Sequence, residues 1–128
     1  MTARTAIQIG DPRLQERAVA IAGEELAKKP LLRAITDLVD TMRKGELVGI
    51  AAPQIGIAKR LFVTEIRKTK YRNEGLDILR VFINPRITWV SKATITMYEG
   101  CGSVNSGNLF GKVTRPKSVE IAYIDEKG

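Results

Sequence analysis

Residues 30–56 read PLLRAITDLVDTMRKGELVGIAAPQIG, and the first half of this stretch predicts the main helix of the fold. Pro30 suits a first helical turn, and the basic Arg43-Lys44 pair followed by Gly45 is typical of a helix end. Apolar side chains recur from residue 31 at i, i+1, i+4, i+7, i+8 and i+11, on one face of a helix. These are Leu31, Leu32, Ile35, Leu38, Val39 and Met42. We therefore predict an amphipathic helix that ends at Gly45.

Outside this helix the apolar pattern is that of short β-strands. Residues 60–66 are apolar and β-branched, and residues 93–98 alternate as ATITMY. Pro85 interrupts residues 78–90 and predicts an edge or a bend, because proline cannot donate to a strand ladder. The strand-like segments are residues 6–9, 60–66, 78–90, 93–98 and 119–124, with a polar loop over residues 67–75. The sequence predicts an α+β fold of mixed and antiparallel strands packed around the amphipathic helix.

The last four residues, 125–128, read DEKG and form a turn pattern after the strand-like residues 119–124. No return strand follows, so that strand would lack its neighbour in the sequence. We therefore expect a single domain over residues 1–128 that is truncated at its C-terminus, or that is completed by a second chain or an oligomer.

The composition favours a cytoplasmic protein. The chain has 128 residues, 44% of them apolar, which suits one domain with a hydrophobic core. It contains no apolar run near the roughly 20 residues that a membrane-spanning helix needs, and no signal-peptide pattern. A single cysteine excludes an internal disulfide and fits a reducing compartment. We therefore expect a location in the cytoplasm and no contact with a membrane.

The net charge is +7, from 21 Lys and Arg residues against 14 Asp and Glu residues. Such a charge fits a solvated basic surface, and it also fits an attraction to RNA or ribosomes. No arginine-rich block or aromatic-basic motif indicates dedicated nucleic-acid recognition. An association with ribosomes is therefore an expectation that rests on charge alone.

The absence of histidine restricts the possible chemistry more sharply. Catalytic zinc sites usually take three protein ligands, which are imidazoles, thiolates or carboxylates. In this chain only Cys101 and carboxylates could serve, because the sequence contains no histidine. The side chain that most often acts as a general base at neutral pH is missing as well. We therefore do not expect a complete catalytic metal site within these residues.

The first motif whose residues could take part in binding or catalysis is LVGIAAPQIG, residues 47–56. Its small residues Gly49, Ala51 and Ala52 allow another backbone or a ligand to approach closely. Gln54 can donate and accept hydrogen bonds, so it can orient a carbonyl group or stabilise an oxyanion. The alternative is a tight packing turn beneath the helix, with Gln54 bonded to the backbone.

The second motif is EGCGS, residues 99–103. Two glycines free the backbone around Cys101, whose thiolate could act as a metal ligand or as a nucleophile. The alternative is a small buried cysteine without a chemical role. Nucleophilic catalysis is disfavoured because no histidine is present to act as the base.

Together the two motifs resemble the peptide deformylase family, metal-dependent hydrolases that remove the formyl group from N-formylmethionine of nascent polypeptides. Residues 48–56 are similar to the family's first signature, GxGLAAxQ, and residues 99–104 to its second, EGCLS. Residues 7–14 resemble the N-terminal IGDPrL segment, and residues 81–85 a strand that ends in Asn-Pro. Residues 113–116 resemble the V-x-R-P strand that follows.

The resemblance implies a role for each matching residue. Cys101 would bind the catalytic divalent metal, Fe²⁺ in the physiological enzyme, with Ni²⁺, Zn²⁺ or Co²⁺ as substitutes. Gln54 and the backbone N–H of Gly102 would hold the formyl oxygen as it becomes an oxyanion. Glu99 would orient the site, and we infer that it pairs with Arg115. The residues expected to bind the N-formylmethionyl peptide are Val48, Gly49, Ile50, Glu99 and Gly100, with Gly49 approaching the peptide backbone.

The chain also departs from the family pattern. The third signature, His-Glu-x-x-His on a C-terminal helix, is absent. Gly102 replaces the usual leucine, which predicts a lost pocket wall and a freer loop. Leu47 stands where a glycine is usual, and Asn105 replaces a frequent proline.

These departures lead to two hypotheses about function. We expect this chain alone to be inactive, and the parent protein with downstream residues to be a deformylase. The alternative is a non-catalytic deformylase-like module that binds formylated or other peptide N-termini. Without the missing helix at the centre of the fold, we also expect the apolar face over residues 31–42 to be partly uncovered.

Overall fold

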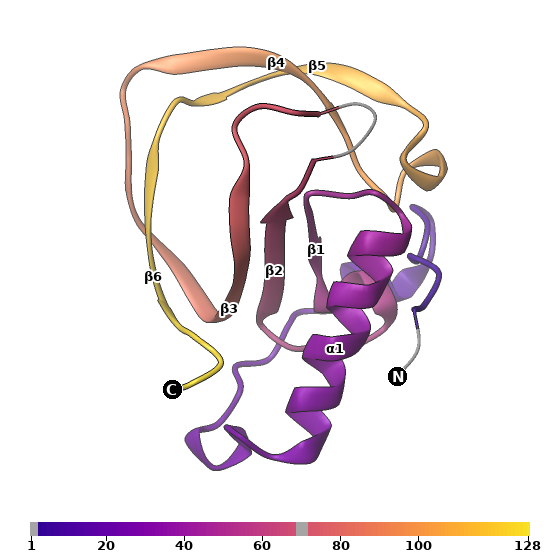
Figure 1. Cartoon of the computed structure of the whole chain (residues 1–128), viewed down its shortest axis with the longest axis vertical. Coiled ribbons are helices and arrows are strands. Elements are labelled where there is room, and N and C mark those ends of the chain that lie inside the picture. Colours follow the sequence, from indigo (N-terminus) through magenta and orange to yellow (C-terminus); the bar gives the residue numbers. More distant parts are fainter. Residues whose placement is uncertain (1–2, 69–71) are drawn as a thin grey trace.

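The architecture is a helix packed on an antiparallel sheet, with a two-stranded ribbon projecting from it (Figure 1). The structure is a computed structural model that describes residues 3–68 and 72–128. The sheet has the strand order β1-β2-β3-β6, and the ribbon pairs β4 with β5. The elements are α1 (Lys29–Lys44), β1 (Gly49–Ala51), β2 (Leu61–Ile66), β3 (Asp77–Val90), β4 (Thr94–Gly100), β5 (Phe110–Pro116) and β6 (Val119–Ile124). The predicted α+β class is confirmed.

The apolar face of α1 forms one side of the hydrophobic core. Leu38 and Met42 are fully buried, and the helix packs against β1 and β2, where Val63 is also fully buried. Burial of a side chain of this size stabilises the fold by about 1.5–3 kcal/mol. This face is partly uncovered, as expected, because Leu32 is exposed and Ile35 is only half-buried. The other predicted residues of the face are buried.

β3 continues through the proline at which we predicted a break or a bend. Its pairing register with β6 shifts between Ile83 and Arg86, and Asn84 adopts a left-handed φ of 51°. The Asn84 amide is held by Ile21, whose N–H it accepts at 2.8 Å and whose carbonyl it donates to at 2.8 Å. A β-bulge therefore absorbs Pro85 without ending the strand.

The N-terminal segment is extended but is not the strand that we predicted over residues 6–9. Its amides donate to two separate loops, from Ile7 to Gln54 O at 2.7 Å and from Ile9 to Ser103 O at 2.7 Å. Each loop accepts only one such bond, so no ladder forms. The segment instead joins the two motifs singled out in the sequence.

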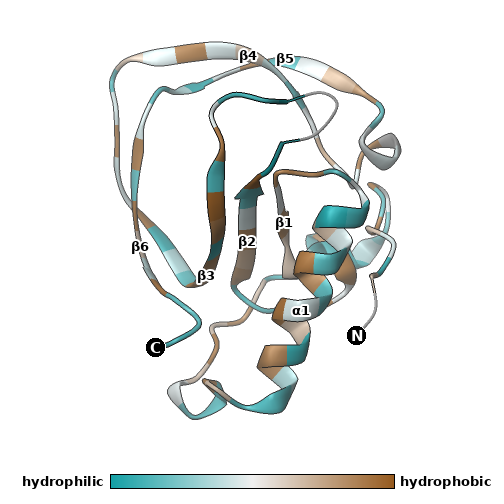
Figure 2. Cartoon of the chain, viewed as in Figure 1, coloured by the Kyte–Doolittle hydropathy of each residue, from teal (hydrophilic) through white to brown (hydrophobic). Residues whose placement is uncertain are grey.

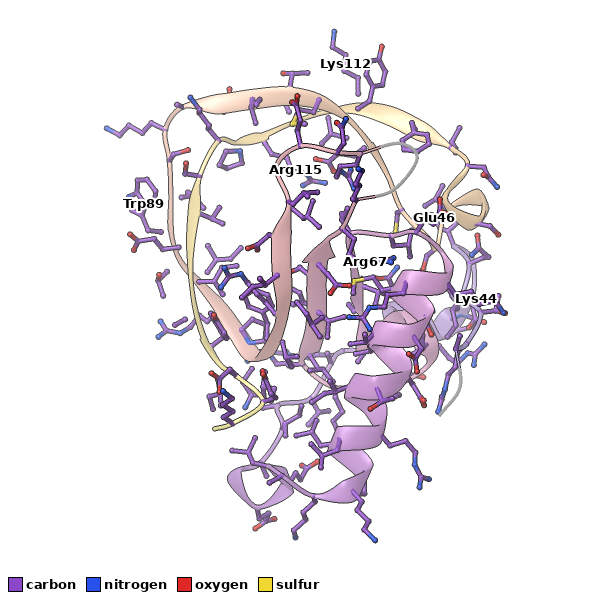
Figure 3. All side chains as sticks on the ribbon, viewed as in Figure 1. Lys44, Glu46, Arg67, Trp89, Lys112 and Arg115 are labelled. Atoms are coloured by element: carbon purple, nitrogen blue, oxygen red, sulfur yellow. The ribbon has the colours of Figure 1, made fainter. Side chains whose placement is uncertain are left out.

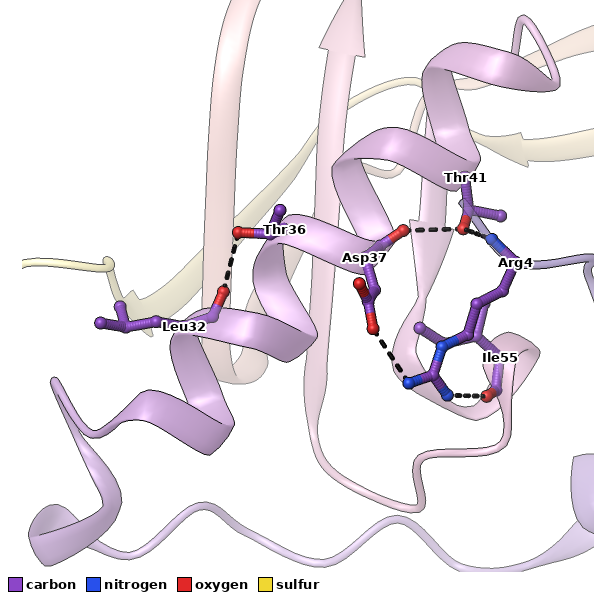
Figure 4. A network of polar contacts seen from close by, with 6 residues as sticks. All are labelled: Arg4, Leu32, Thr36, Asp37, Thr41 and Ile55. Carbon is purple, nitrogen blue, oxygen red and sulfur yellow. Dashed lines mark hydrogen bonds and ion pairs between the residues drawn. The ribbon is translucent and has the colours of Figure 1, made fainter. Parts of the chain in front are cut away.

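Arg4 anchors the start of this segment to α1 (Figure 4). Its guanidinium donates to the buried carboxylate of Asp37 at 2.9 Å, and its amide donates to Thr41 Oγ1 at 2.8 Å. The Thr41 hydroxyl in turn donates to the Asp37 carbonyl at 2.7 Å. The charge of Asp37 is thereby paired and hydrogen-bonded, as a buried carboxylate requires.

The β4–β5 ribbon forms an arch at the end of the molecule where it lies apart from α1 (Figure 1). Apolar stretches of β3 and β4 alternate with polar ones (Figure 2). Lys112 points outward from the arch, whereas Arg115 points towards the body of the molecule (Figure 3). The uncovered apolar side chains of this region are Ile87, Trp89, Val90, Ile95, Met97, Tyr98, Leu109, Phe110 and Val119. Much of the exposed apolar surface therefore lies on the ribbon, the second half of β3 and the start of β6.

Three further expectations concern the loop, the last strand and membranes. The predicted loop over residues 67–75 connects β2 to β3, and its residues 69–71 lie outside the described residues. β6 has the predicted bounds and pairs with β3, and it forms one edge of the sheet over the described residues. In the described part of the chain, no helix is both long and apolar enough to span a membrane.

Candidate functional site

β1 and the turn after it fix the position of Gln54. The chain leaves β1 through a short 3₁₀ helix, Ala52–Ile55, which ends at Gly56 with a left-handed φ of 84°. Gln54 Oε1 accepts the N–H of Ala51 at 2.9 Å. Because the carbonyl end of the amide is held in this way, its Nε2 group is turned towards the loop that carries Cys101.

The two sequence motifs meet at this amide. Gln54 Nε2 donates to Ser103 Oγ at 3.0 Å and lies 3.6 Å from Cys101 Sγ. Gln54 is bonded to backbone at one end of its amide, as in the alternative interpretation, and its other end binds the second motif. Cys101 itself is exposed, so it is not the small buried cysteine of the alternative interpretation.

The loop between Cys101 and Val104 orients the amide of Gly102. Val104 N donates to Cys101 O at 2.9 Å and closes a turn. In a trans peptide the C=O of Cys101 and the N–H of Gly102 point in opposite directions, so this N–H points away from the turn. It has no acceptor among the described residues. It is therefore a donor that a ligand oxygen could use.

Leu47 fills the space over Gly102, whereas the lost pocket wall and the freer loop stay predictions. Gly102 is buried, and a Cβ at this position would lie only 2.8 Å from Leu47 Cδ1. A Cβ at Gly107 would also meet the Leu47 side chain, at 3.8 Å. The two departures at positions 47 and 102 therefore compensate, because the leucine at 47 occupies the space over the glycine at 102.

The free edge of β1 is the next part of the site. β1 pairs with β2 on one side, and no strand of the described residues pairs with its other side. A Cβ at Gly49 would lie 3.2 Å from Val63 O, so the glycine allows β1 to pack closely against β2. The side chain of Ile50 is 3% exposed and belongs to the core, so only its backbone is available to a peptide, and its role in binding stays a prediction. Val48 is 41% exposed beside this edge.

Glu99 and Arg115 form the ion pair inferred from the sequence. Arg115 Nε donates to the Glu99 carboxylate at 2.7 and 2.9 Å across the β4–β5 ribbon. This bond from Arg115 lowers the pKa of Glu99, and the same contact raises the pKa of Arg115. Glu99 lines a cavity of about 420 Å³ together with Cys101. Apolar side chains line much of this cavity, namely Val104, Leu109, Phe110 and Val113.

Comparison with known proteins explains this combination of motifs. The family model for polypeptide deformylase matches residues 3–128. The chain belongs to the polypeptide deformylase family. It is 35% identical over 124 residues to peptide deformylase 1 of Ralstonia nicotianae, and 33% identical over 128 residues to the peptide deformylase of Leptospira biflexa. These matches cover 95% and 98% of this chain, and it spans 66% and 70% of the length of those two relatives.

Solved deformylases share the fold as well. A class I type b peptide deformylase of Acinetobacter baumannii, with Met-Ala-Ser bound, superposes with a TM-score of 0.92 at 27% identity. That match covers 99% of this chain and 79% of the other. The deformylase of Ehrlichia chaffeensis in complex with actinonin gives a TM-score of 0.85 at 25% identity, over 100% of this chain and 72% of the other.

The deformylase family implies a metal, and the residues present here do not complete a site for one. Cys101 is an exposed thiol, which suits a ligand, but the described residues contain no group of three His, Cys, Asp or Glu side chains that could hold an ion. The carboxylate of Glu99 is already engaged by Arg115. Cys101 is therefore at most one ligand, and the described residues do not complete a metal site around it.

Sequence reasoning missed two residues of this deformylase-family site. Ser103 was part of the EGCGS motif, and its hydroxyl could have been singled out as a partner for an amide. Gln8 gave no signal, because it lies in a short extended run far from both motifs in the sequence. In the structure its side chain bonds the carbonyl of Gly102 at 2.7 Å and the amide of Ser106 at 2.8 Å.

Proposed function

We propose that this chain binds the N-formylmethionyl end of a peptide and holds the formyl oxygen between Gln54 and Gly102, as the substrate-binding part of a deformylase. The observation that carries the proposal is the contact of Gln54 Nε2 with both Cys101 Sγ and Ser103 Oγ, the two residues that flank Gly102. Membership of the family and the Met-Ala-Ser bound to the Acinetobacter relative support it.

The proposed chemistry of these residues is oxyanion stabilisation. Hydrolysis of a formamide adds water to the formyl carbon, and the formyl oxygen gains negative charge before formate and the amine separate. Gln54 and the Gly102 amide are held by Ala51 and by the Val104–Cys101 turn, so little reorganisation is needed when that charge develops. Loss of one such donor typically costs about 2.7–4 kcal/mol of transition-state stabilisation.

The peptide would lie along the free edge of β1. An extended peptide can add to a sheet edge through main-chain hydrogen bonds, while pockets beside the edge select side chains. The cavity of about 420 Å³ next to Cys101 is largely apolar and suits a methionine side chain. Cys101 lies at this cavity, where it would serve as one ligand of a divalent metal, Fe²⁺ by family resemblance.

A non-catalytic peptide-binding module is the second candidate function. The observation in its favour is that the described residues contain no group of three His, Cys, Asp or Glu side chains that could hold a metal ion. The deformylase requires preferential binding of formylated N-termini, whereas the module could bind formylated or other peptide N-termini and would release no formate.

The first experiment measures the affinity of the chain for formyl-Met-Ala-Ser and for Met-Ala-Ser by calorimetry. We expect the formylated peptide to bind roughly tenfold more tightly, because the formyl oxygen adds one or two hydrogen bonds. Gln54→Glu keeps the acceptor for Ala51 and removes the donor, so it should abolish this preference. Asn73→Asp, at an exposed position, controls for the added charge. Equal affinities of the wild-type chain for the two peptides would contradict the proposal.

The second experiment tests whether the chain releases formate by itself. The wild-type chain is incubated with formyl-Met-Ala-Ser and Fe²⁺ or Ni²⁺ under reducing conditions, and formate is assayed. Formate release that depends on Cys101 would show that the chain is a deformylase by itself. Binding of the formylated peptide without formate release would support the binding module, or a deformylase whose remaining ligands lie elsewhere.

A further inference from the structure

We infer that Gln8 is a positioning residue for this site, which holds the loop 101–106 in the conformation that presents Gly102 to Gln54. The inference deepens the proposed function and rests on it. Gln8 matches no site residue expected from the sequence, and it lies on the N-terminal segment, outside both motifs.

The side-chain amide of Gln8 is bonded at both of its ends. Nε2 donates to Gly102 O at 2.7 Å and to Ala6 O at 3.0 Å, and Oε1 accepts the N–H of Ser106 at 2.8 Å. The amide thus spans the loop from Gly102 to Ser106. Because Val104 N also donates to Cys101 O, the peptide groups on both sides of Gly102 have fixed orientations.

The loop contains a backbone conformation that needs such support. Ser106 has a φ of 52°, in the left-handed region that residues other than glycine rarely adopt, and Gly107 follows with a φ of 83°. A strained residue of this kind persists only where the surrounding structure holds it in place. The hydrogen bond that Ser106 N donates to Gln8 Oε1 is such a restraint.

The same segment also fixes the other half of the site. On either side of Gln8, Ile7 N donates to Gln54 O and Ile9 N donates to Ser103 O, each at 2.7 Å. Residues 7–9 therefore hold both the backbone of Gln54 and the loop 101–106 in place. A change at Gln8 removes the side-chain part of this link and leaves both backbone bonds in place.

A purely structural role for Gln8 would lower stability without changing the site. A matched control exists, because Asn84 holds Ile21 in the same manner, donating to its carbonyl and accepting its N–H. Gln8→Glu and Asn84→Asp both keep the acceptor, lose the donor and place a negative charge opposite a carbonyl oxygen. The two variants differ in that only Gln8 contacts the loop of the site.

The experiment compares these variants with the wild-type chain in two measurements. The first is the ratio of affinities for formyl-Met-Ala-Ser and Met-Ala-Ser, and the second is the rate of Cys101 alkylation by iodoacetamide. We expect Gln8→Glu to lower the affinity ratio by roughly two- to tenfold, the effect of one hydrogen bond, and to raise the alkylation rate several-fold. Asn84→Asp should leave both unchanged. If Gln8→Glu does not fold, Gln8→Met tests the same bonds without the charge.

The outcomes distinguish this inference from the proposed function. If the wild-type chain binds both peptides equally, the proposed function fails, and the alkylation rate then decides whether Gln8 positions the loop. If Gln8→Glu lowers stability as Asn84→Asp does, and leaves both the affinity ratio and the alkylation rate unchanged, Gln8 is a structural residue and the inference is overturned.

Discussion

Two regions of this molecule have the same strand-rich character but differ in packing. In the packed half, α1, β1, β2 and residues 77–83 of β3 enclose side chains such as Leu38 and Val63 that have no contact with solvent. In the open half, residues 86–90 of β3 and the strands β4, β5 and β6 expose large side chains such as Trp89 and Phe110. Trp89 projects outward from this region (Figure 3).

The difference shows where the site obtains its rigidity. Gly100 ends β4 and Cys101 follows it, and both are exposed, whereas Gly102 and Ser103 are buried against the packed half. The loop therefore crosses from the open half to the packed half within two residues. Its donors are held by residues of the packed side, and its thiol and cavity face the open side. Substitutions in the two halves should differ in their consequences accordingly.

The largest difference is expected for leucines in the two halves. Leu38→Ala removes a fully buried side chain from the core and should cost about 2–5 kcal/mol in the free energy of unfolding, measured by urea denaturation. Leu109→Ala makes the same chemical change at a side chain that is 57% exposed, and should cost about 1 kcal/mol or less. Equal costs would show that the open half is covered in solution, for example by a second copy of the chain.

The second comparison concerns the two glycines on either side of Cys101. A Cβ at Gly102 would lie 2.8 Å from Leu47, and one at Gly100 would lie 2.8 Å from the ring of Phe110. Leu47 is packed against the core, so Gly102→Ala should cost about 1–3 kcal/mol in the free energy of unfolding. Phe110 is 62% exposed and can rotate into solvent, so Gly100→Ala should cost less than about 0.5 kcal/mol.

A double variant tests whether Leu47 is the cause. Leu47→Ala opens the space over Gly102, so the cost of Gly102→Ala should fall when both changes are combined. We expect a coupling of about 0.5–3 kcal/mol between the two positions in urea denaturation. Additive costs would mean that the Gly102 effect arises from the backbone and that the two departures from the family pattern are independent.

The sequence predicted the elements whose signals are local. The helix α1 and the strands β2 and β6 follow from periodicity and β-branched runs, and the structure places them within about one residue of the prediction. The predicted strand at residues 6–9 failed because its partners are single carbonyls in distant loops. Pro85 does interrupt the strand pairing locally, but the left-handed Asn84 beside it forms a bulge and the strand continues. Whether a proline ends a strand or is absorbed in a bulge depends on tertiary contacts, which local sequence rules do not include.

The site was predictable only where a motif carried it. Gln54 and Cys101 were found through their motifs, and the pairing of Glu99 with Arg115 followed from their opposite charges. The close approach of Leu47 to Gly102 was missed because the two departures from the family pattern were interpreted separately. Contacts between residues that are far apart in the sequence, such as those of Gln8, have no local signal at all.

The smallest expected effect is the pH dependence of one ion pair in each half. Arg43 donates to Glu65 at 2.9 Å in the packed half, and this bond lowers the pKa of Glu65 below its ordinary value of 4.5. Because the folded pKa is the lower one, the pair contributes stability above pH 4.5, and the contribution is lost as the pH falls through the folded pKa. The Arg115–Glu99 pair lowers the pKa of Glu99 in the same direction, but both side chains are more exposed.

The measurement is the free energy of unfolding of Glu65→Gln and Glu99→Gln relative to the wild type, between pH 7 and pH 3. The deficit of Glu65→Gln should shrink on acidification and change little when salt is added, because its carboxylate is 11% exposed. Any deficit of Glu99→Gln should be smaller and should vanish in salt of about 0.5 M, because exposed pairs are screened. A deficit of Glu65→Gln that grows on acidification, or that salt removes as readily as that of Glu99→Gln, would show that the two halves do not differ in how they shield charge.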